Sequence, residues 1–454
     1  MAKALTEAVI LAGGKGTRLA PRLGGLPKPL VDVAGVPLLE RQLLHCKSFG
    51  IKSVLLLVNH RADCIAEFCA RKDNFGLRIS LVDDGEPRGT GGATLAALPY
   101  LAPDSQDVLI LYGDTLLNID LDRFNAAHVA TGADVSLFLH PNAHPQDSDL
   151  VELDESGYLA KLHPYPHPDG AEYPNLVNAA LYIMKKSFLM DFCYLTEEAP
   201  KIIDFAKDVF PLLLKKGKKL YGYISPEYIK DVGTPQRLDN AVADIASGRF
   251  AGGTLRLSRR AVFLDRDGVL NAEVGYITKP EQIRLLPGSA QAVGRLNRAG
   301  LPAVVVTNQP VLARGECDEA ALQAVHTRLE HLLGLEGAYI DRLYYCPHHP
   351  DKGFAGERPE LKIVCACRKP APGMLFKAAK DLHIDIPNSW FVGDRKSDIQ
   401  CAKNAGCRSI LTAVEVSGPD GNIFADMGEV RPDFQVRDLA AAVDIILQRQ
   451  EGTR

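Results

Sequence analysis

Two aspartates that could share one reaction, Asp265 and Asp267, follow directly on the apolar run Ala261–Leu264. Residues two apart on a strand point to the same face, and a turn after the strand can direct both into one site. One carboxylate can then act as a nucleophile and the other as a proton donor and acceptor. Further polar side chains follow later apolar runs of the same half, namely Thr307, Asn308, Asp394 and Asp398, and Arg368 and Lys369 supply positive charge.

A glycine-rich turn, Gly13–Thr17, follows another apolar run near the N-terminus. Backbone N–H groups in such a turn can approach phosphate oxygens closely, and Arg18 adds positive charge beside them. The turn lacks the Gly-Lys-Ser/Thr ending of a P-loop and the third glycine of the dinucleotide fingerprint. It therefore indicates a phosphate site of another kind.

Several residues could complete a nucleotide site around this turn. Lys28 lies between two prolines, and Gly89–Ala93 is a second glycine turn, suited to lie against a flat base. Asp114 follows the apolar run Val108–Tyr112, and Asp231 lies in a later Asp-Val-Gly-Thr segment. Two carboxylates at strand ends suit Mg²⁺ bound to a triphosphate.

A set of nitrogen and sulfur ligands occurs in two close pairs, Cys346 with His348 and Cys365 with Cys367. Four such ligands suit tetrahedral Zn²⁺ in a structural site. Because Cys367 lies two residues before Lys369, the zinc ion would fix the loop that carries this lysine.

The composition is that of an ordinary globular protein. The chain has 454 residues and a formal net charge of −4, so we expect no binding to nucleic acid or to an anionic membrane. No apolar run approaches the roughly 20 residues of a membrane helix, and no secretory signal is found. We therefore expect a cytoplasmic protein with reduced cysteines that binds small molecules, and its oligomeric state is left open.

Short apolar runs alternate with helical patterns in two successive blocks, which predicts an α/β protein with two doubly wound domains. Residues 1–245 form the first domain and residues 260–454 the second, with a glycine-rich linker over 246–259. We expect a largely parallel sheet in the first domain because its runs are buried and β-rich. The predicted strands are Ala8–Ala12, Val54–Val58, Val108–Tyr112, Val135–Leu139, Ala261–Leu264, Ala303–Val306, Leu343–Cys346, Trp390–Val392 and Ser409–Thr412, and predicted helices cover Pro37–Phe49 and Asp438–Gln450.

The ordered set of motifs in residues 1–245 resembles the sugar nucleotidyltransferase family, which joins a nucleoside triphosphate and a sugar 1-phosphate. The resemblance implies a Rossmann-like sheet, with Mg²⁺ held by Asp114 and Asp231. It implies that Lys28 neutralises charge at the reacting α-phosphate and that Asn178 contacts the sugar. The residues it assigns to nucleotide binding are Leu11, Gly13, Gly14, Thr17, Arg18, Lys28, Asp84 and Gly91.

Two positions differ from the pattern of that family. Relatives carry a lysine for the sugar phosphate where this chain has the stretch His163–Pro168, so this role is missing or falls to another residue such as Lys161. The base-side glutamate is replaced by Asp84 or supplied by Glu86, and a carboxylate there would suit guanine. Within the stretch, His163 and His167 have the spacing of metal ligands, but the prolines between them favour loop residues.

The set of motifs in residues 260–454 resembles the haloacid dehalogenase phosphatase superfamily. The resemblance implies that Asp265 attacks phosphorus, while Asp267 protonates the leaving oxygen and then activates water. Contacts to the phosphoryl group and the substrate would come from Thr307, Lys369, Asn308 and Arg368. The Mg²⁺ ligands would be Asp265, Asp394 and the backbone carbonyl of Asp267, supported by Asp398.

The segments between these motifs are short and leave little room for a cap domain. We therefore expect a nearly capless phosphatase domain. A zinc-bearing, nearly capless member resembles two types, the heptose 1,7-bisphosphate phosphatases and the histidinol-phosphate phosphatases. The segments that look closer to the heptose type are Gly275–Tyr276, Ala313–Gly315, Cys346–Pro350 and Lys369–Met374.

The two resemblances together imply a bifunctional enzyme of nucleotide-activated heptose synthesis. Removal of the 7-phosphate from D-glycero-D-manno-heptose 1,7-bisphosphate leaves heptose 1-phosphate, which a transferase could join to GMP from GTP, releasing pyrophosphate. Two alternatives stay open. One is a histidinol-phosphate phosphatase fused to a mannose or glucose 1-phosphate nucleotidyltransferase. The other is an N-terminal domain that senses nucleotide sugars without catalysis and regulates the phosphatase.

Overall fold

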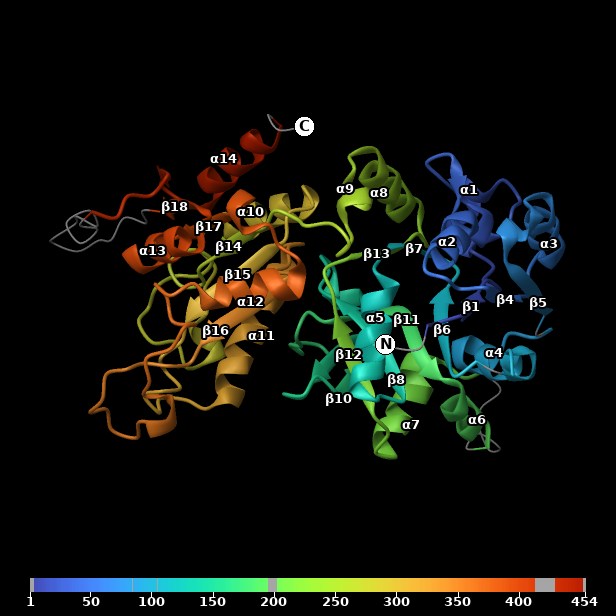
Figure 1. Cartoon of the computed structure of the whole chain (residues 1–454), viewed down its shortest axis with the longest axis horizontal. Coiled ribbons are helices and arrows are strands. Elements are labelled where there is room, and N and C mark those ends of the chain that lie inside the picture. Colours follow the sequence, from blue (N-terminus) through green and yellow to red (C-terminus); the bar gives the residue numbers. More distant parts are fainter. Residues whose placement is uncertain (1–3, 84, 104, 195–201, 413–428, 452–454) are drawn as a thin grey trace. The chain divides into compact units, whose positions relative to one another are not determined.

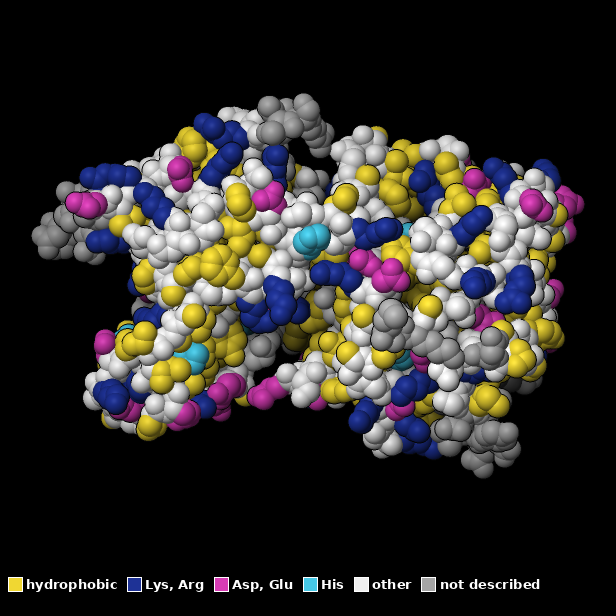
Figure 2. Space-filling view, in the orientation of Figure 1, with side chains coloured by type: hydrophobic (Ala, Val, Ile, Leu, Met, Phe, Trp, Pro, Cys, Tyr) yellow, Lys and Arg dark blue, Asp and Glu magenta, His cyan; other side chains and the backbone are white. Residues whose placement is uncertain are grey.

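The computed structural model describes residues 4–83, 85–103, 105–194, 202–412 and 429–451, and the chain divides into two compact units. Unit 1 comprises Met1–His140, Ser148–Tyr165 and Leu176–Thr254, and unit 2 comprises Pro141–Asp147, Pro166–Asn175 and Leu255–Arg454. Each unit is an α/β structure built on its own sheet, as predicted (Figure 1). On the face shown in Figure 2, acidic and basic side chains are interspersed. None of the helices in the described ranges is long and apolar enough to cross a bilayer.

Unit 1 contains a nine-stranded sheet in which β10-β9-β11-β6-β1-β4-β5 lie in that order, while β8 pairs with β11 and β12. The sheet is mixed, because β11 runs antiparallel to both β6 and β8, whereas β1 is parallel to β4 and β6. The prediction of a largely parallel sheet is therefore wrong for this part, since burial on both faces does not reveal strand direction. The strands are β1 (Glu7–Leu11), β4 (Ser53–Val58), β5 (Arg78–Asp83), β6 (Asp107–Tyr112), β8 (Val135–His140), β9 (Leu150–Leu153), β10 (Leu159–His163), β11 (Val177–Lys185) and β12 (Leu220–Ile224).

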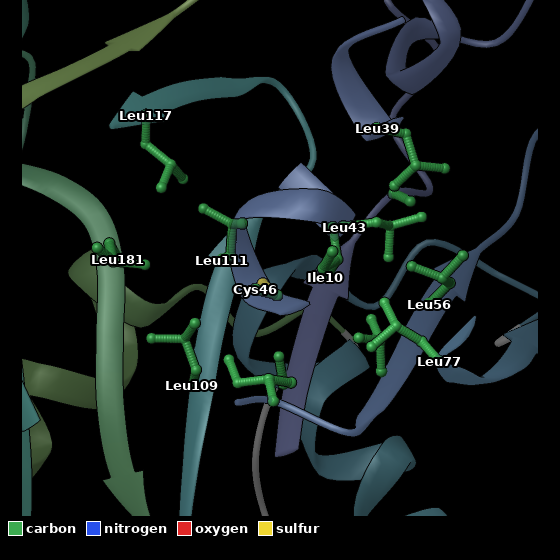
Figure 3. Packing of buried hydrophobic residues seen from close by; sticks show 14 of the residues in the cluster. Ile10, Leu39, Leu43, Cys46, Leu56, Leu77, Leu109, Leu111, Leu117 and Leu181 are labelled. Carbon is green, nitrogen blue, oxygen red and sulfur yellow. The ribbon is translucent and has the colours of Figure 1, made fainter. Parts of the chain in front are cut away.

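Hydrophobic side chains of these strands pack on both faces of the sheet. In β1, Ile10 belongs to one core cluster and its neighbour Val9 to another, because successive residues of a strand point to opposite faces. Figure 3 shows the first cluster, in which Ile10 lies near Leu43 of helix α2. The α-helices of this unit are α1 (Ala20–Leu23), α2 (Leu38–Ser48), α3 (Ala62–Arg71), α4 (Gly89–Ala97), α5 (Leu121–Thr131), α6 (Lys186–Tyr194), α7 (Phe210–Lys215), α8 (Pro235–Ala246) and α9 (Arg249–Gly252), the last of which lies within the predicted linker.

A two-stranded ribbon outside the main sheet brings together two distant parts of unit 1. Strands β7 (Thr115–Asn118) and β13 (Tyr228–Asp231) run antiparallel, with Asp231 opposite Thr115. Asp114 precedes Thr115 and Val232 follows Asp231. The Val232 N–H donates a hydrogen bond to the Asp114 carbonyl over 2.9 Å. The ribbon therefore places Asp231 beside the turn that carries Asp114. A second short ribbon joins β2 (Asp32–Val33) and β3 (Val36–Pro37).

Unit 2 contains a six-stranded sheet in the order β16-β15-β14-β17-β18-β19, and all its pairs are parallel. The chain leaves the central strand β14 for β15 on one side and later returns to β17 on the other. Ligand sites in open α/β sheets lie at the carboxyl ends of the strands where the order reverses in this way. The strands are β14 (Val262–Leu264), β15 (Ala303–Asn308), β16 (Arg342–Cys346), β17 (Trp390–Gly393), β18 (Arg408–Thr412) and β19 (Phe434–Val436).

Helices cover both faces of this second sheet. Side chains of α10, α11 and α14 share one core cluster with the sheet, and side chains of α12 and α13 share another. Val262 belongs to the first cluster and Phe263 to the second, so β14 is buried on both faces. The helices are α10 (Ser289–Arg298), α11 (Glu319–Leu335), α12 (Gly373–Leu382), α13 (Lys396–Ala405) and α14 (Leu439–Glu451).

Candidate active sites

The glycine-rich turn of unit 1 follows β1 and passes close to Lys28. Gly16 has a φ of 63°, and a Cβ added to it would lie 2.9 Å from the Cβ of Lys28. A Cβ on Gly13 would meet Asn59 at 3.3 Å, whereas one on Gly14 would meet nothing within 4 Å. The small residues thus allow the turn to approach Lys28 while leaving open space beside Gly14.

Lys28 and Asp114 form an ion pair, with Nζ 2.5 Å from Oδ2. Gly113 docks the turn that carries Asp114 onto the start of the glycine-rich segment, because its N–H donates to the Leu11 carbonyl over 3.0 Å. A Cβ on Gly113 would lie only 2.7 Å from that carbonyl oxygen. The absence of a side chain at Gly113 therefore permits the close approach of two strand ends that brings Asp114 to Lys28.

Three of the predicted charged residues converge around Gly233. A Cβ on Gly233 would lie 3.2 Å from Asp231 Oδ1, 3.4 Å from Lys28 Nζ and 3.7 Å from Arg18 Nη2. Together with the ion pair to Asp114, this places two carboxylates and two cations around one small cradle. Carboxylates of this kind suit Mg²⁺, and the cations suit phosphate oxygens.

Sequence reasoning missed a third cation in this site, Arg237. Its Nη1 donates to both oxygens of Asp231, over 2.8 and 2.9 Å. Arg237 lies in the first turn of α8, whose N-cap residue Thr234 accepts from the Arg237 N–H. The Thr-Pro pair that follows Gly233 could have signalled a helix start and hence a side chain directed back toward Asp231.

The predicted base and sugar contacts of unit 1 stay predictions. Asp84 lies outside the described residues, and Glu86 is exposed. Gly91 is buried, and a Cβ on it would lie 2.9 Å from the Val209 side chain, so packing within the chain already accounts for a glycine here. Asn178 Oδ1 accepts from the Ala180 N–H over 3.3 Å, at an irregularity of β11.

The residues near the missing sugar-phosphate lysine are engaged with each other. Lys161 Nζ lies 3.1 Å from Glu152, and His163 Nε2 lies 2.8 Å from the other oxygen of the same carboxylate. The ring of His167 lies against Tyr173. Neither histidine belongs to a group of three or more potential metal ligands found in the described part of the chain. His167 lies in a loop, as expected, but His163 ends strand β10, so the expectation of a loop residue is wrong for His163.

Asp265, Thr307 and Asp394 lie at the carboxyl ends of the neighbouring strands β14, β15 and β17 in unit 2. The ligand oxygens of Asp265, Asp394 and Asp398 all lie within 4.8 Å of one another. Lys369 Nζ lies among them, 2.8 Å from Asp265 Oδ1 and 2.7 Å from Asp398 Oδ1. One lysine therefore faces three largely buried carboxylates.

Three carboxylates in this cluster face two cations, Lys369 and the more distant Arg395. Burial raises the pKa of Asp265 to about 6, although Lys369 opposes the shift. Burial, and then repulsion by Asp265 and Asp398, raises the pKa of Asp394 to about 8. Asp394 Oδ1 is buried, and in the described part of the chain it accepts no hydrogen bond. An unpartnered buried oxygen in an oxygen-rich, net negative cluster fits a hard divalent cation such as Mg²⁺.

Asp267 lies in a different environment from Asp265. Arg266, which is fully buried, binds its two oxygens through Nε at 3.0 Å and Nη2 at 2.8 Å. Asn271 and Gln309 donate to the same carboxylate over 2.9 and 3.0 Å. Burial disfavours ionisation of Asp267, but Arg266 and these hydrogen bonds outweigh it and hold the pKa below its usual value. Two carboxylates two residues apart thus lie in opposite electrostatic settings. The pKa is raised for Asp265 and lowered for Asp267, which is the reverse of what a nucleophile and a general acid need, so their roles rest on the resemblance and not on these shifts.

The remaining predicted residues of unit 2 position this cluster. Asn308 Nδ2 donates to the Lys369 carbonyl over 3.1 Å, and Asn308 Oδ1 accepts from the Lys369 N–H over 3.0 Å. Thr307 Oγ1 accepts from Gln309 Nε2 over 2.9 Å, and Arg368 Nη1 donates to the His348 carbonyl. Asn308 therefore holds the main chain of Lys369, a role that the sequence did not suggest, and its substrate contact stays a prediction.

The four predicted zinc ligands also lie together. The ligand atoms of Cys346, His348, Cys365 and Cys367 are within 4.8 Å of one another, and the three Sγ–Sγ distances are 3.5, 3.3 and 3.2 Å. These distances exclude disulfides. They approach the separation of roughly 3.8 Å between thiolates on one tetrahedral zinc with Zn–S bonds of about 2.3 Å. The donor set and its spacing fit Zn²⁺.

Both halves of the chain are similar to known proteins. Residues 7–248 match the nucleotidyl transferase family model, and residues 366–442 match a HAD-hydrolase-like family model. The D-glycero-D-manno-heptose-1,7-bisphosphate 7-phosphatase of Thermosynechococcus vestitus is 42% identical over 198 residues, which cover 42% of this chain and 96% of that protein. The D-glycero-beta-D-manno-heptose-1,7-bisphosphate 7-phosphatase of Escherichia coli K12 is 38% identical over 168 residues, covering 37% and 86%.

Solved structures resemble each half separately. HddC from Yersinia pseudotuberculosis covers 53% of this chain and 100% of its own length, with 23% identity and a TM-score of 0.45. The D,D-heptose 1,7-bisphosphate phosphatase from B. bronchiseptica, complexed with magnesium and phosphate, covers 42% of this chain and 99% of its own, with 35% identity and a TM-score of 0.36.

Proposed function

Because the chain belongs to the nucleotidyl transferase family and, through its C-terminal half, to the family of the heptose-bisphosphate 7-phosphatases, we propose that it is a bifunctional enzyme of nucleotide-activated heptose synthesis. It removes the 7-phosphate of D-glycero-D-manno-heptose 1,7-bisphosphate and transfers GMP from GTP to the resulting heptose 1-phosphate. The observation that carries the proposal is the presence of both sites in one chain, since the product of the phosphatase is the sugar 1-phosphate that the transferase requires. GTP follows from the resemblance described above.

In the phosphatase, Asp265 attacks the phosphorus, and the sugar oxygen leaves with a proton from Asp267. Water then attacks the phosphoaspartate and gives a proton back to Asp267, which releases phosphate and free Asp265. Lys369 and Thr307 neutralise and orient the phosphoryl oxygens. Asp265, Asp394 and the carbonyl of Asp267 would hold Mg²⁺, which supplies further positive charge to the phosphoryl group when bound.

In the transferase, an oxygen of the sugar phosphate attacks the α-phosphorus of the nucleotide, and pyrophosphate leaves. Lys28 and Arg18 neutralise the charge that develops on the phosphates, so positioning suffices and no protein nucleophile is needed. The glycine-rich turn provides backbone N–H groups to the triphosphate. Asp114 and Asp231 would hold Mg²⁺, which neutralises the triphosphate when bound.

The zinc site is structural in this proposal. Cys346, His348, Cys365 and Cys367 would bind Zn²⁺ and hold the loop that leads into Lys369. We further propose that the transferase comprises residues 1–245 and the phosphatase residues 260–454, joined by 246–259. The enzyme would work in the cytoplasm on sugar phosphates and a nucleoside triphosphate.

Mass spectrometry of the products tests the function directly. The protein is incubated with heptose 1,7-bisphosphate, Mg²⁺ and each nucleoside triphosphate in turn. We expect phosphate, heptose 1-phosphate, pyrophosphate and GDP-heptose, with GTP the preferred nucleotide. The variant Asp265→Asn should stop phosphate release from the bisphosphate but still form GDP-heptose when heptose 1-phosphate is added, whereas Asp114→Ala should release phosphate and form no GDP-heptose. Hydrolysis of histidinol phosphate in preference to the heptose substrate, or no pyrophosphate release with any sugar 1-phosphate, would contradict the corresponding half.

A further inference from the structure

A buried glutamine supports the turn that carries Asp114. Gln42 lies on α2, and its side chain is buried. Its Nε2 donates to the carbonyl of Tyr112 over 2.9 Å and to the carbonyl of Thr115 over 2.7 Å. Its Oε1 accepts no hydrogen bond within the described residues. The side chain therefore contributes through its two donors, and both acceptors flank Asp114.

These two hydrogen bonds complete a set of contacts around the turn. Gly113 is bonded to the Leu11 carbonyl, and the Asp114 carbonyl accepts from Val232. Gln42 bonds the chain on both sides of these points, at the end of β6 and at the start of β7. The main chain from Tyr112 to Thr115 is thus held from β1, from the β13 end and from α2. A small rotation of this turn would move the Asp114 carboxylate away from Lys28, which it meets at 2.5 Å.

We propose that Gln42 is a positioning residue of the transferase site, which fixes the Asp114 carboxylate against Lys28 by holding both ends of its turn. The inference rests on the proposed transferase function. A purely structural role for Gln42 would also satisfy the two carbonyls, because buried acceptors without a donor are costly. The two roles differ in their effect on turnover, since a displacement of about 1 Å in a site can cost about 100-fold in rate.

The test replaces Gln42 by methionine, which has a similar shape but no donor. Transferase kcat and KM are measured by pyrophosphate release from GTP and heptose 1-phosphate, together with the Mg²⁺ concentration for half-maximal rate. We expect kcat to fall about 10- to 100-fold, the Mg²⁺ requirement to rise several-fold and the KM for the sugar phosphate to change little. Binding of Mn²⁺, followed by electron paramagnetic resonance, should weaken in parallel. Phosphatase activity of the same chain, which Gln42 does not touch, should stay unchanged.

Asn118 provides a matched control. Its Nδ2 also donates to two backbone carbonyls, those of Phe250 and Ala251, over 2.9 and 3.3 Å, but neither acceptor flanks a carboxylate of the site. Asn118→Leu removes the same number of donors and should leave transferase kcat within about twofold, because it disturbs packing away from the reacting groups. Equal losses in both variants would assign Gln42 a structural role only.

Two further outcomes keep the inference separate from the proposed function. A wild-type chain that releases no pyrophosphate with any nucleotide refutes the transferase function itself. A wild-type chain that is active and a Gln42→Met variant that keeps its kcat and Mg²⁺ requirement refute only the inference. If Gln42→Met does not fold, Gln42→Asn is judged by the same criteria, because the amide is retained but is one methylene too short to reach both carbonyls.

Discussion

Lys369 lies between Asp265 and Asp398, with its Nζ within 2.8 Å of the first carboxylate and 2.7 Å of the second. All three side chains are nearly inaccessible to solvent. Burial disfavours the charged ammonium, but the two carboxylates outweigh it and hold the pKa of Lys369 above its ordinary value. The lysine is therefore charged at any pH at which the enzyme works, and in the proposed phosphatase it would serve both the phosphoryl group and the stability of the site.

Replacing Lys369 by methionine should abolish the phosphatase and destabilise unit 2. Loss of the cation leaves buried carboxylates without a partner, which typically costs about 3–5 kcal/mol. We expect phosphatase kcat to fall at least about 1000-fold and the unfolding transition of unit 2 to move to lower temperature in calorimetry. Lys377→Met on α12, an exposed pair with Asp381, is the control and should change neither. Retained phosphate release in Lys369→Met would remove this residue from the mechanism.

Gly268 should tolerate no side chain, because it packs against Asp394. A Cβ on Gly268 would lie 2.1 Å from Asp394 Oδ2, and its φ is +78°. Gly288 has the same φ of +78° but nothing within 4 Å of its Cβ position. Both Gly→Ala variants therefore carry the backbone strain of about 1 kcal/mol, and only Gly268→Ala displaces the carboxylate. We expect Gly268→Ala alone to lose phosphatase activity, with Mg²⁺ affinity reduced in titration calorimetry. Equal phosphatase activity in both variants would show that the position of Asp394 does not matter for catalysis.

Arg237→Gln should slow the transferase. The guanidinium fixes the Asp231 carboxylate through two hydrogen bonds. Without these bonds the carboxylate is free to rotate, and the entropy lost in ordering it is added to the barrier when substrate binds. We expect kcat/KM for pyrophosphate release to fall about tenfold, which corresponds to the loss of about 1.4 kcal/mol of transition-state stabilisation. Arg22→Gln breaks the exposed pair with Asp239 and should have almost no effect. An Arg237→Gln enzyme as fast as the parent would show that Asp231 needs no such support.

Acid should destabilise unit 2 through His326. This side chain is buried on α11, and burial, together with nearby Arg266, lowers its pKa to about 3. The folded-state pKa is below the unfolded value of about 6.5, so the unfolded chain binds the extra proton between these values. Stability is therefore full above about pH 6.5 and is lost as the pH falls toward 3, by up to about 1.4 kcal/mol per pH unit. His326→Leu should show a shallower loss of unfolding temperature between pH 6.5 and 5 than the parent. His331→Leu on the same helix is the control, and identical slopes for all three proteins would contradict the assignment.

Zinc should be present at one ion per chain and should support the phosphatase selectively. Cys367→Ser removes one of four ligands next to the Lys369 loop, so we expect loss of bound zinc in elemental analysis and at least about a tenfold loss of phosphatase activity. Transferase activity should persist. Cys317→Ser changes a free cysteine outside the four-ligand group and is the control. A parent protein purified without zinc that is fully active would contradict a structural zinc site.

Much of this molecule follows from local sequence. The apolar runs that predict β1, β14 and β17 are strands within a residue or two of the expected bounds, because a short β-rich run between turn residues has few other ways to be buried. The residues that could take part in catalysis or metal binding come directly after such runs. Parallel strands that share an edge bring their ends together, so Asp265, Thr307 and Asp394 could be assigned to one site before their positions were known. The grouping of Cys346, His348, Cys365 and Cys367 could likewise be predicted from four potential ligands in two close pairs.

The tertiary structure decided the residues that hold those groups in place. Arg237 binds Asp231, Arg266 binds Asp267, and Gln42 holds the turn of Asp114. The sequence offers at most a hint of one of these pairings, the helix start at Thr234 that precedes Arg237. The direction of β11 was equally hidden, because a strand buried on both faces has the same apolar pattern whether it runs parallel or antiparallel. Local sequence determines what a residue can do chemically and where a strand ends. Which side chain lies within 3 Å of it depends on pairings between segments far apart in the chain, and only the packed fold specifies these.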